Sequence, residues 1–195
     1  MRCVGLISIF VGLVFASPSL AQGWMEYVNM EEHFLTNFPG QPVIEDYEYD
    51  YEKGQLPELI SGEITAKRFQ AFDGDSRYAV IVVNYQEIDH ITTLRGAVSH
   101  AASLYRKMGD ATYDTYAHLE RLDGHQLQLT LPDMRQMYVG IYFHYPDRRL
   151  YILEAEVPAS APPPQHFAAA LQILDEEGNP IRYQIDENGN ATRQR

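Results

Sequence analysis

The alternation of apolar and polar residues is clearest between His125 and Val157. Three runs there, 125–131, 137–143 and 150–157, follow a period of two. Breaks containing Pro and Asp separate them, at 131–133 and 145–148. This pattern predicts three β-strands in a meander. The side chains expected on the core face of this meander are Leu127, Leu129, Met137, Val139, Ile141 and Phe143.

Further strands are predicted on both sides of the meander. Asp73-Gly74-Asp75 predicts a hairpin turn between two β-rich runs, and the second run is almost continuously apolar from Tyr78 to Val83. That run is typical of a central strand covered on both faces. Asp123-Gly124 predicts a tight turn into the meander. The predicted strands outside the meander are 24–28, 33–38, 43–52, 63–72, 77–85, 112–122 and 181–185.

Two helices are predicted. The segment Thr93 to Met108 repeats apolar residues at spacings of three and four, which gives one apolar stripe, and Gly109 follows where a helix would end. The segment Pro164 to Leu174 has a shorter stripe that includes Phe167 and Leu171, and Pro near the first turn favours a helix start. We expect both helices to pack on the sheet.

The first 21 residues read as a secretory signal peptide. Arg2 precedes an apolar run of about a dozen residues, Val4 to Phe15, which is short of the ~20 needed to span a bilayer. Ser19-Leu20-Ala21 is a small-x-small cleavage site. An uncleaved anchor is the less favoured alternative because the run is short. Cleavage after Ala21 would remove the only cysteine, Cys3, so the mature chain forms no internal disulfide.

Size and charge restrict the class of partner. Removing the 21-residue leader from 195 residues leaves 174, enough for one domain with a packed core. The formal net charge is −12 with the leader and −13 without Arg2. An acidic chain is a poor partner for nucleic acid or for anionic membrane surfaces. After signal cleavage no apolar run is long enough to span a membrane.

The segment Val43 to Glu52 alternates tyrosines with acids. An acidic ladder for a cation such as calcium is one interpretation, and a solvated edge strand is the other. We favour the edge strand, because calcium needs ligands that converge from loops. Asp186 to Asn190 resembles the start of a calcium-binding loop, but Ala191 replaces its required glycine.

The common catalytic motifs are absent from the sequence. It contains no G-x-S-x-G elbow, no phosphate-binding glycine loop and no H-E-x-x-H, and no cofactor or metal is predicted. His125 falls on the leucine face of its strand, where we expect a hydrogen-bonded structural histidine. His100 is expected at the edge of its helical stripe.

The other face of the meander is the candidate binding surface. Alternation places Tyr138, Tyr142 and His144 there, together with Gln126, Gln128 and Thr130. Gly140 leaves a gap in the middle of this face, where a ligand would approach the backbone. If the neighbouring strands pair in register, more polar side chains join one patch. A solvated sheet face is the alternative. The six candidate partner-binding residues are Tyr116, His118, Tyr138, Tyr142, His144 and Glu154.

Three sequence features together resemble a family. They are Phe38-Pro39-Gly40-Gln41-Pro42 soon after the leader, Asp123-Gly124-His125 opening a meander whose last strand starts Arg149-Leu150-Tyr151, and a proline-rich loop before Phe167. The chain resembles a group of small, uncharacterised secreted proteins of Gram-negative bacteria with a PsbP-like fold. The resemblance implies an antiparallel sheet flanked by helices. It also implies a binding module, since relatives with this fold include the extrinsic photosystem II subunit and a nuclear-import factor that binds Ran. It supplies no functional residue.

The sequence therefore predicts an α+β domain at residues 22–185, with an antiparallel sheet flanked by two main helices and a polar tail at 186–195. We expect a non-catalytic periplasmic or secreted domain that binds a protein or small molecule. The alternative is a hydrolase or a His/carboxylate metalloenzyme that uses the polar face of the sheet.

Overall fold

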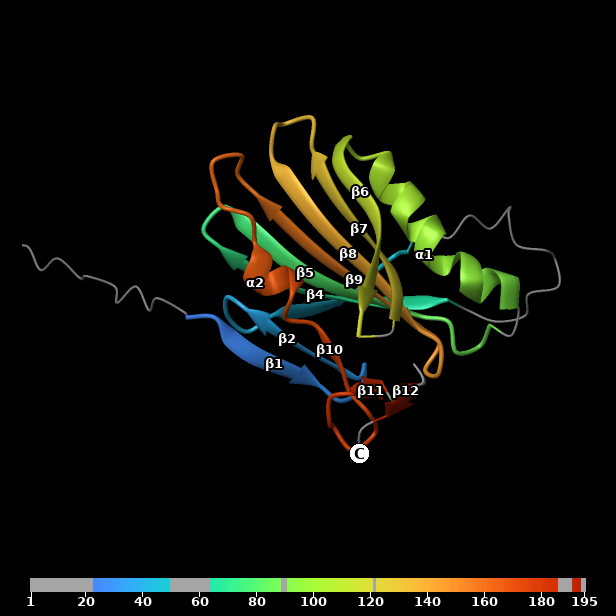
Figure 1. Ribbon diagram of the computed structural model, residues 1–195. Helices are drawn as coiled ribbons and strands as arrows, with labels where there is room; N and C mark the ends of the chain where they lie inside the picture. The colour runs from blue at the N-terminus through green and yellow to red at the C-terminus, as the bar shows by residue number, and fades with distance from the viewer. Residues whose placement is uncertain (1–22, 50–63, 89–90, 121, 186–190, 194–195) are drawn as a thin grey trace, which may run out of the picture.

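A seven-stranded antiparallel sheet forms the centre of the molecule. The computed structural model describes residues 23–49, 64–88, 91–120, 122–185 and 191–193, so the predicted signal peptide lies outside the described residues. The order across the sheet is β3-β4-β5-β9-β8-β7-β6 (Figure 1). Its strands are β3 (Val43–Asp46), β4 (Thr65–Asp73), β5 (Ser76–Asn84), β6 (Asp110–Leu119), β7 (Leu122–Thr130), β8 (Gln136–His144) and β9 (Arg149–Val157).

The predicted meander is confirmed as β7, β8 and β9. Each strand pairs antiparallel with the next, with Leu127 opposite Val139 and Ile141 opposite Ile152. The hairpin at Gly74 is also confirmed, and this glycine has a positive φ of 56°. β5 lies in the middle of the sheet between β4 and β9, as its continuous apolar run predicts. β3 forms one edge, which agrees with the edge-strand interpretation of the acidic segment.

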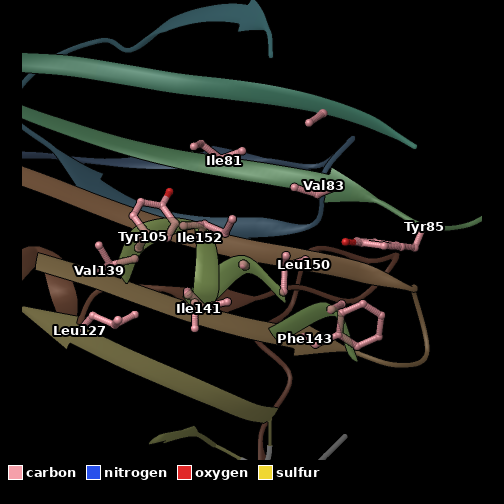
Figure 2. Close-up of a cluster of buried hydrophobic side chains, with 14 of the residues drawn as sticks. Ile81, Val83, Tyr85, Tyr105, Leu127, Val139, Ile141, Phe143, Leu150 and Ile152 are labelled. Carbon is pink, nitrogen blue, oxygen red and sulfur yellow. The ribbon is translucent and has the colours of Figure 1, made fainter. Parts of the chain in front are cut away.

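Helix α1 (Ile91–Arg106) covers one face of the sheet (Figure 1). The apolar row predicted from the meander is buried here against α1, and Figure 2 shows its side chains converging with those of β5 and with Tyr105 of the helix. We call this the helix face. Its buried residues include Ile81, Val83, Leu127, Leu129, Met137, Val139, Ile141, Phe143, Leu150 and Ile152.

The opposite face packs against smaller elements. These are a three-stranded sheet of β1 (Met25–Asn29), β2 (Phe34–Phe38) and β10 (Gln172–Ile173), and the short helix α2 (Gln165–Ala168). Phe34 and Phe38 of β2 and Phe167 of α2 are buried there against Val80, Tyr151 and their neighbours. We call this the groove face, because part of it stays open.

The expected α+β architecture with two main helices is wrong. The chain is mostly β-structure, and α2 has only four residues instead of the predicted span of 164–174. Isolated helices of about ten residues are marginal, and this one competes with strand pairing. Gln172 and Ile173 pair with Leu35 and Phe34 of β2, so their backbone groups are satisfied in a sheet. The apolar stripe is still buried, but a strand buries its second half.

Two further expectations are corrected at hairpins. The turn between β6 and β7 lies at Glu120, which has a positive φ of 55°, and not at Asp123-Gly124; both of these residues lie within β7. Near the C-terminus, β11 (Tyr183–Ile185) pairs with β12 (Ala191–Arg193), so part of the predicted polar tail is in a strand.

Candidate functional site

Polar and aromatic side chains form rows across the groove face of β6, β7 and β8. Antiparallel register places Tyr113 opposite Gln128, and Gln128 opposite Tyr138. The next row contains Gln126 opposite Gly140. Because paired residues in an antiparallel sheet point to the same side, these side chains share one surface. The predicted polar face of the meander is therefore present.

The two glutamines are held by the tyrosines. The amide of Gln126 donates to the hydroxyl of Tyr142 at 2.8 Å, and that of Gln128 donates to the hydroxyl of Tyr138 at 3.2 Å. The Tyr142 side chain is only 2% exposed, and burial raises the pKa of its hydroxyl, although the bond from Gln126 partly offsets this. Both amides thus have fixed orientations, and their oxygens are still able to accept hydrogen bonds.

Tyr142 occupies the gap that the sequence suggested for a ligand. A Cβ added to Gly140 would meet the Tyr142 ring at 3.1 Å. A Cβ added to Gly124, on the neighbouring strand, would meet the same ring at 2.4 Å and the Ile141 carbonyl oxygen at 2.5 Å. The two glycines therefore make room for the Tyr142 ring to lie across β7 and β8. Tyr142 is a structural floor and not an exposed contact.

A groove of about 350 Å³ opens above this floor. Residues of α2 and the preceding proline loop form its far wall, and the sheet rows form its base. This volume is at the small end of the range for ligand pockets, about 300–1,000 Å³. We call it the tyrosine–glutamine groove, and its main lining residues are Tyr113, Gln126, Gln128, Tyr138, Pro163 and Phe167.

The six residues predicted as one patch lie on two faces. Tyr138 and Tyr142 line the tyrosine–glutamine groove, and His144 lies further along β8 on the same face. Tyr116 pairs with His125, whose partner Ile141 is in the helix-face core. His118 and Glu154 also belong to the helix face. The single patch is therefore wrong, because residues in one cross-strand row share a face. The rows of Tyr116, His118 and Glu154 contain Ile141, Phe143 and Val139 of the helix face.

Glu154 of β9 has a structural role, because its carboxylate contacts Tyr105 near the end of α1. It is 4% exposed, accepts a hydrogen bond from the hydroxyl of Tyr105, and lies 2.7 Å from Nη1 of Arg77. Burial, followed by the charge of Glu154, raises the pKa of Tyr105 well above its usual value. A buried carboxylate with two partners is satisfied without a ligand.

His125 is confirmed as a hydrogen-bonded histidine. Its Nε2 contacts Asp114, and Arg106 of α1 binds the same carboxylate through Nε at 2.6 Å. Arg106 and then His125 hold the pKa of Asp114 well below its usual value. Tyr116 is 85% exposed and lies edge-on to His125, with ring centroids 5.3 Å apart. This group fastens the end of α1 to β6 and β7.

His144 belongs to a second polar cluster on the groove face. Its Nδ1 lies 3.0 Å from Oδ2 of Asp147, which is 3.3 Å from Nδ1 of His33. Burial alone would raise the pKa of Asp147, but the two histidines outweigh that effect and lower it. The Nε2 of His144 is buried without a hydrogen-bond partner among the described residues. The cluster borders a cavity of about 260 Å³ that acidic residues 175–177 also line.

The sequence interpretation missed three of the six main lining residues of the groove. Tyr113 stands three positions before Tyr116 on β6, so alternation places the two side chains on opposite faces of the strand. Because Tyr116 belongs to the helix face, this alternation assigns Tyr113 to the groove face. Pro163 and Phe167 reach the groove because the proline loop and α2 fold back over the sheet. No local sequence pattern predicts that these two segments fold back over the sheet.

The described residues offer no ready metal centre. Within them, no group of three or more His, Cys, Asp or Glu side chains is arranged to hold a metal ion. Within the same part of the chain, no helix has the length and apolar character needed to cross a membrane.

Comparison with known proteins identifies no family. No family model matches the chain, and no curated protein matches its sequence. Among solved structures, the chain is similar to the solution structure of cyanobacterial PsbP (CyanoP) from Synechocystis sp. PCC 6803. The identity is 9% and the TM-score is 0.43, over 83% of this chain and 98% of the other.

Proposed function

We propose that this chain is a non-catalytic binding domain of an exported protein, periplasmic or secreted, and that its ligand binds in the tyrosine–glutamine groove. The observation that carries the proposal is the lining of the groove. Aromatic rings and oriented amides face an open volume, and among the residues that the structure describes the lining contains no Asp, Glu, His, Lys or Arg. Apolar walls with a few fixed polar groups are typical of ligand sites.

The chemistry of the lining favours binding over catalysis. General acid–base catalysis needs a group that exchanges a proton near neutral pH. The titratable lining groups are tyrosine hydroxyls, and burial raises the pKa of Tyr142 further from neutrality. Export is supported by the N-terminal sequence pattern, with Arg2, the apolar run and Ser19-Leu20-Ala21.

The enzyme alternative has one supporting observation. His33, His144 and Asp147 come together beside the 260 Å³ cavity, and two imidazoles with a carboxylate are residue types used in proton transfer. A hydrolase would use this cluster and not the tyrosine–glutamine groove. For a metalloenzyme, the described residues bring together no set of ligands that could hold the metal. Loss of ester hydrolysis in Asp147→Asn, with hydrolysis by the unmodified protein, would support this alternative.

A blocking substitution tests the binding proposal. Gln128→Trp places a bulky ring on the groove floor, and Thr130→Trp is its matched control on the same strand and face, outside the groove lining. The probes are uncharged aromatic and hydroxylated fragments, and saturation-transfer NMR measures whether each fragment binds. We expect fragments to bind the unmodified protein and Thr130→Trp, but not Gln128→Trp.

Equal fragment binding by all three proteins would place the site elsewhere. No binding to the unmodified protein would contradict the proposal. Circular dichroism and a urea unfolding curve for each variant separate a blocked groove from a lost fold.

A further inference from the structure

The spacing of two rings narrows the class of ligand. Tyr113 and Tyr138 lie on β6 and β8, and Gln128 of β7 lies between them in one row. Neighbouring strands are about 4.8 Å apart, so the two tyrosine backbones are separated by about 10 Å. That separation is close to the length of a disaccharide. The row therefore offers a ring, an amide and a second ring over the span of two sugar units.

The accessible surface of this row suits a ring stacked flat against it. Tyr113 is 51% exposed and Tyr138 is half-buried, so both phenol rings are open to the groove. Tyr142 lies on the same face further along β8, and its ring fills the space over Gly124 and Gly140. A packed ring thus closes the base of the groove beside this row.

Polar groups at the ring edges exclude a purely apolar occupant. The amides of Gln126 and Gln128 are half-buried and already held by phenol hydroxyls. A lipid chain laid over them would remove their water without replacing its hydrogen bonds, at a cost of roughly 1–3 kcal/mol for each group. A pyranose ring has C–H faces for the rings and hydroxyl edges for the amides.

Charge separates neutral sugars from acidic ones. The described residues that line the groove include no charged side chain, so an ionised ligand would lose water without gaining a counter-charge from them. The chain as a whole carries a formal charge of −12, which repels anions at longer range. Uronates and other anionic glycans are therefore disfavoured.

We infer that the tyrosine–glutamine groove binds an uncharged oligosaccharide, with sugar rings stacked on Tyr113 and Tyr138 and hydroxyl or acetamido groups bonded to Gln126 and Gln128. This inference rests on the proposed binding function. The 350 Å³ volume is suited to about two sugar units, with the rest of a longer chain leaving over the β6 edge.

Titration with defined sugars tests the inference. The probes are maltotriose and triacetylchitotriose as neutral trisaccharides and trigalacturonate as the anionic control, each measured by NMR chemical shifts and calorimetry. We expect at least one neutral trisaccharide to bind, and trigalacturonate to bind at least tenfold more weakly.

Variants on β6 assign the site. Tyr113→Ala removes one ring and should weaken the neutral sugar about three- to tenfold, the usual range for an aromatic contact. Tyr113→Phe keeps the ring and should restore affinity to within about twofold of the unmodified protein. Tyr116→Ala is the matched control, since Tyr116 lies on the same strand with its side chain exposed on the helix face. Its affinity should not change.

The outcomes separate this inference from the proposal beneath it. If the uncharged fragments bind in a manner blocked by Gln128→Trp but neither neutral trisaccharide binds, the sugar inference is wrong and the binding domain stands. If neither fragments nor sugars bind, both fail. Equal weakening by Tyr113→Ala and Tyr116→Ala, or equal affinity for trigalacturonate, would also overturn the inference.

Discussion

The two faces of the central sheet are covered in different ways. The helix face lies under α1, a helix of 16 residues, and its rows are apolar from β5 through to β7. The groove face lies under a small sheet and the four-residue α2, and its rows change from apolar on β5 to polar and aromatic on β7. The groove of 350 Å³ lies on the second face.

The difference follows from the length of the covering elements. A long amphipathic helix buries one continuous stripe, and the carboxylate of Glu154 that is buried with it is satisfied by an ion pair with Arg77. Short elements cover only part of a face, so the remaining strand positions must tolerate water or a ligand. Stability and binding are thereby divided between the two sides of one sheet.

Ile141→Ala should show the largest effect. Ile141 is fully buried in the middle of the helix face. Truncation should destabilise the fold by roughly 2–5 kcal/mol, through lost burial and a cavity. Urea unfolding measures this, with Tyr138→Ala, on the same strand and the other face, as the comparison. An equal or greater loss for Tyr138→Ala would show that the groove face carries as much of the packing.

Gly124→Ala tests the floor of the groove. The added methyl would meet both a ring and a backbone carbonyl closer than any normal contact, so the strand must shift. We expect a loss of about 1–3 kcal/mol, as for overpacked sites. Gly140→Ala should cost less, because its nearest neighbour is the Tyr142 side chain at 3.1 Å. Reversal of this order by thermal or urea unfolding would mean that the Tyr142 ring does not lie between the two glycines.

Each face has a carboxylate near its rim whose pKa is lowered on folding. Asp114 on the helix face is held by Arg106 and His125, and Asp147 on the groove face by His144 and His33. A carboxylate whose pKa is lower in the folded state than in the unfolded state stabilises the fold. This contribution is complete above the unfolded-state pKa of about 3.9, and it disappears as the pH falls through the folded-state pKa. Asp114→Asn and Asp147→Asn should each be less stable at neutral pH and lose less on acidification.

Unfolding free energies measured from pH 6 downward check this. Asp133→Asn, at an exposed turn, serves as the control. An acid profile unchanged by Asp147→Asn would mean that the contact with His144 makes no difference to folding. The two variants together show whether acid weakens both faces or only one.

Tyr113→Ala should show the smallest effect on stability. Tyr113 is half exposed at the edge strand β6, and substitutions at such surface positions usually change stability by less than about 0.5 kcal/mol. A urea curve that overlays that of the unmodified protein is expected. A loss above about 1 kcal/mol would place Tyr113 among the residues that hold the fold.

Much of the helix face could be predicted from the sequence. Alternation in 125–157 fixes which residues share a face, and the hairpin at Gly74 fixes the pairing of β4 with β5. The same alternation separates Tyr116 and His118 from Tyr138. A two-residue turn between β6 and β7 pairs even-numbered residues of one strand with odd-numbered residues of the other. Tyr116 and His118 therefore share the face of Leu127 and Leu129.

The groove could be predicted only in part. Its base follows from alternation, since Gln126, Gln128 and Tyr138 were assigned to one surface. Its wall depends on Phe167 and the proline loop, which reach the sheet through contacts distant in sequence. The turn predicted at Asp123-Gly124 was wrong for the same reason. An Asp-Gly pair favours a turn locally, but the Tyr142 ring requires a glycine within the strand at this position.

The pairing of β5 with β9 has a consequence for the time course of folding. These neighbours at the centre of the sheet join residues 76–84 to residues 149–157, whereas β6 to β9 pair each with the next along the chain. Local hairpins close quickly, but a ladder between distant segments must first overcome the entropy of a long loop. We therefore expect the β6–β9 meander with α1 to collapse early, and the β3–β5 unit to join it late. The helix-face core combines residues of β5 with residues of β7, β8, β9 and α1, so it is completed only when the β3–β5 unit joins.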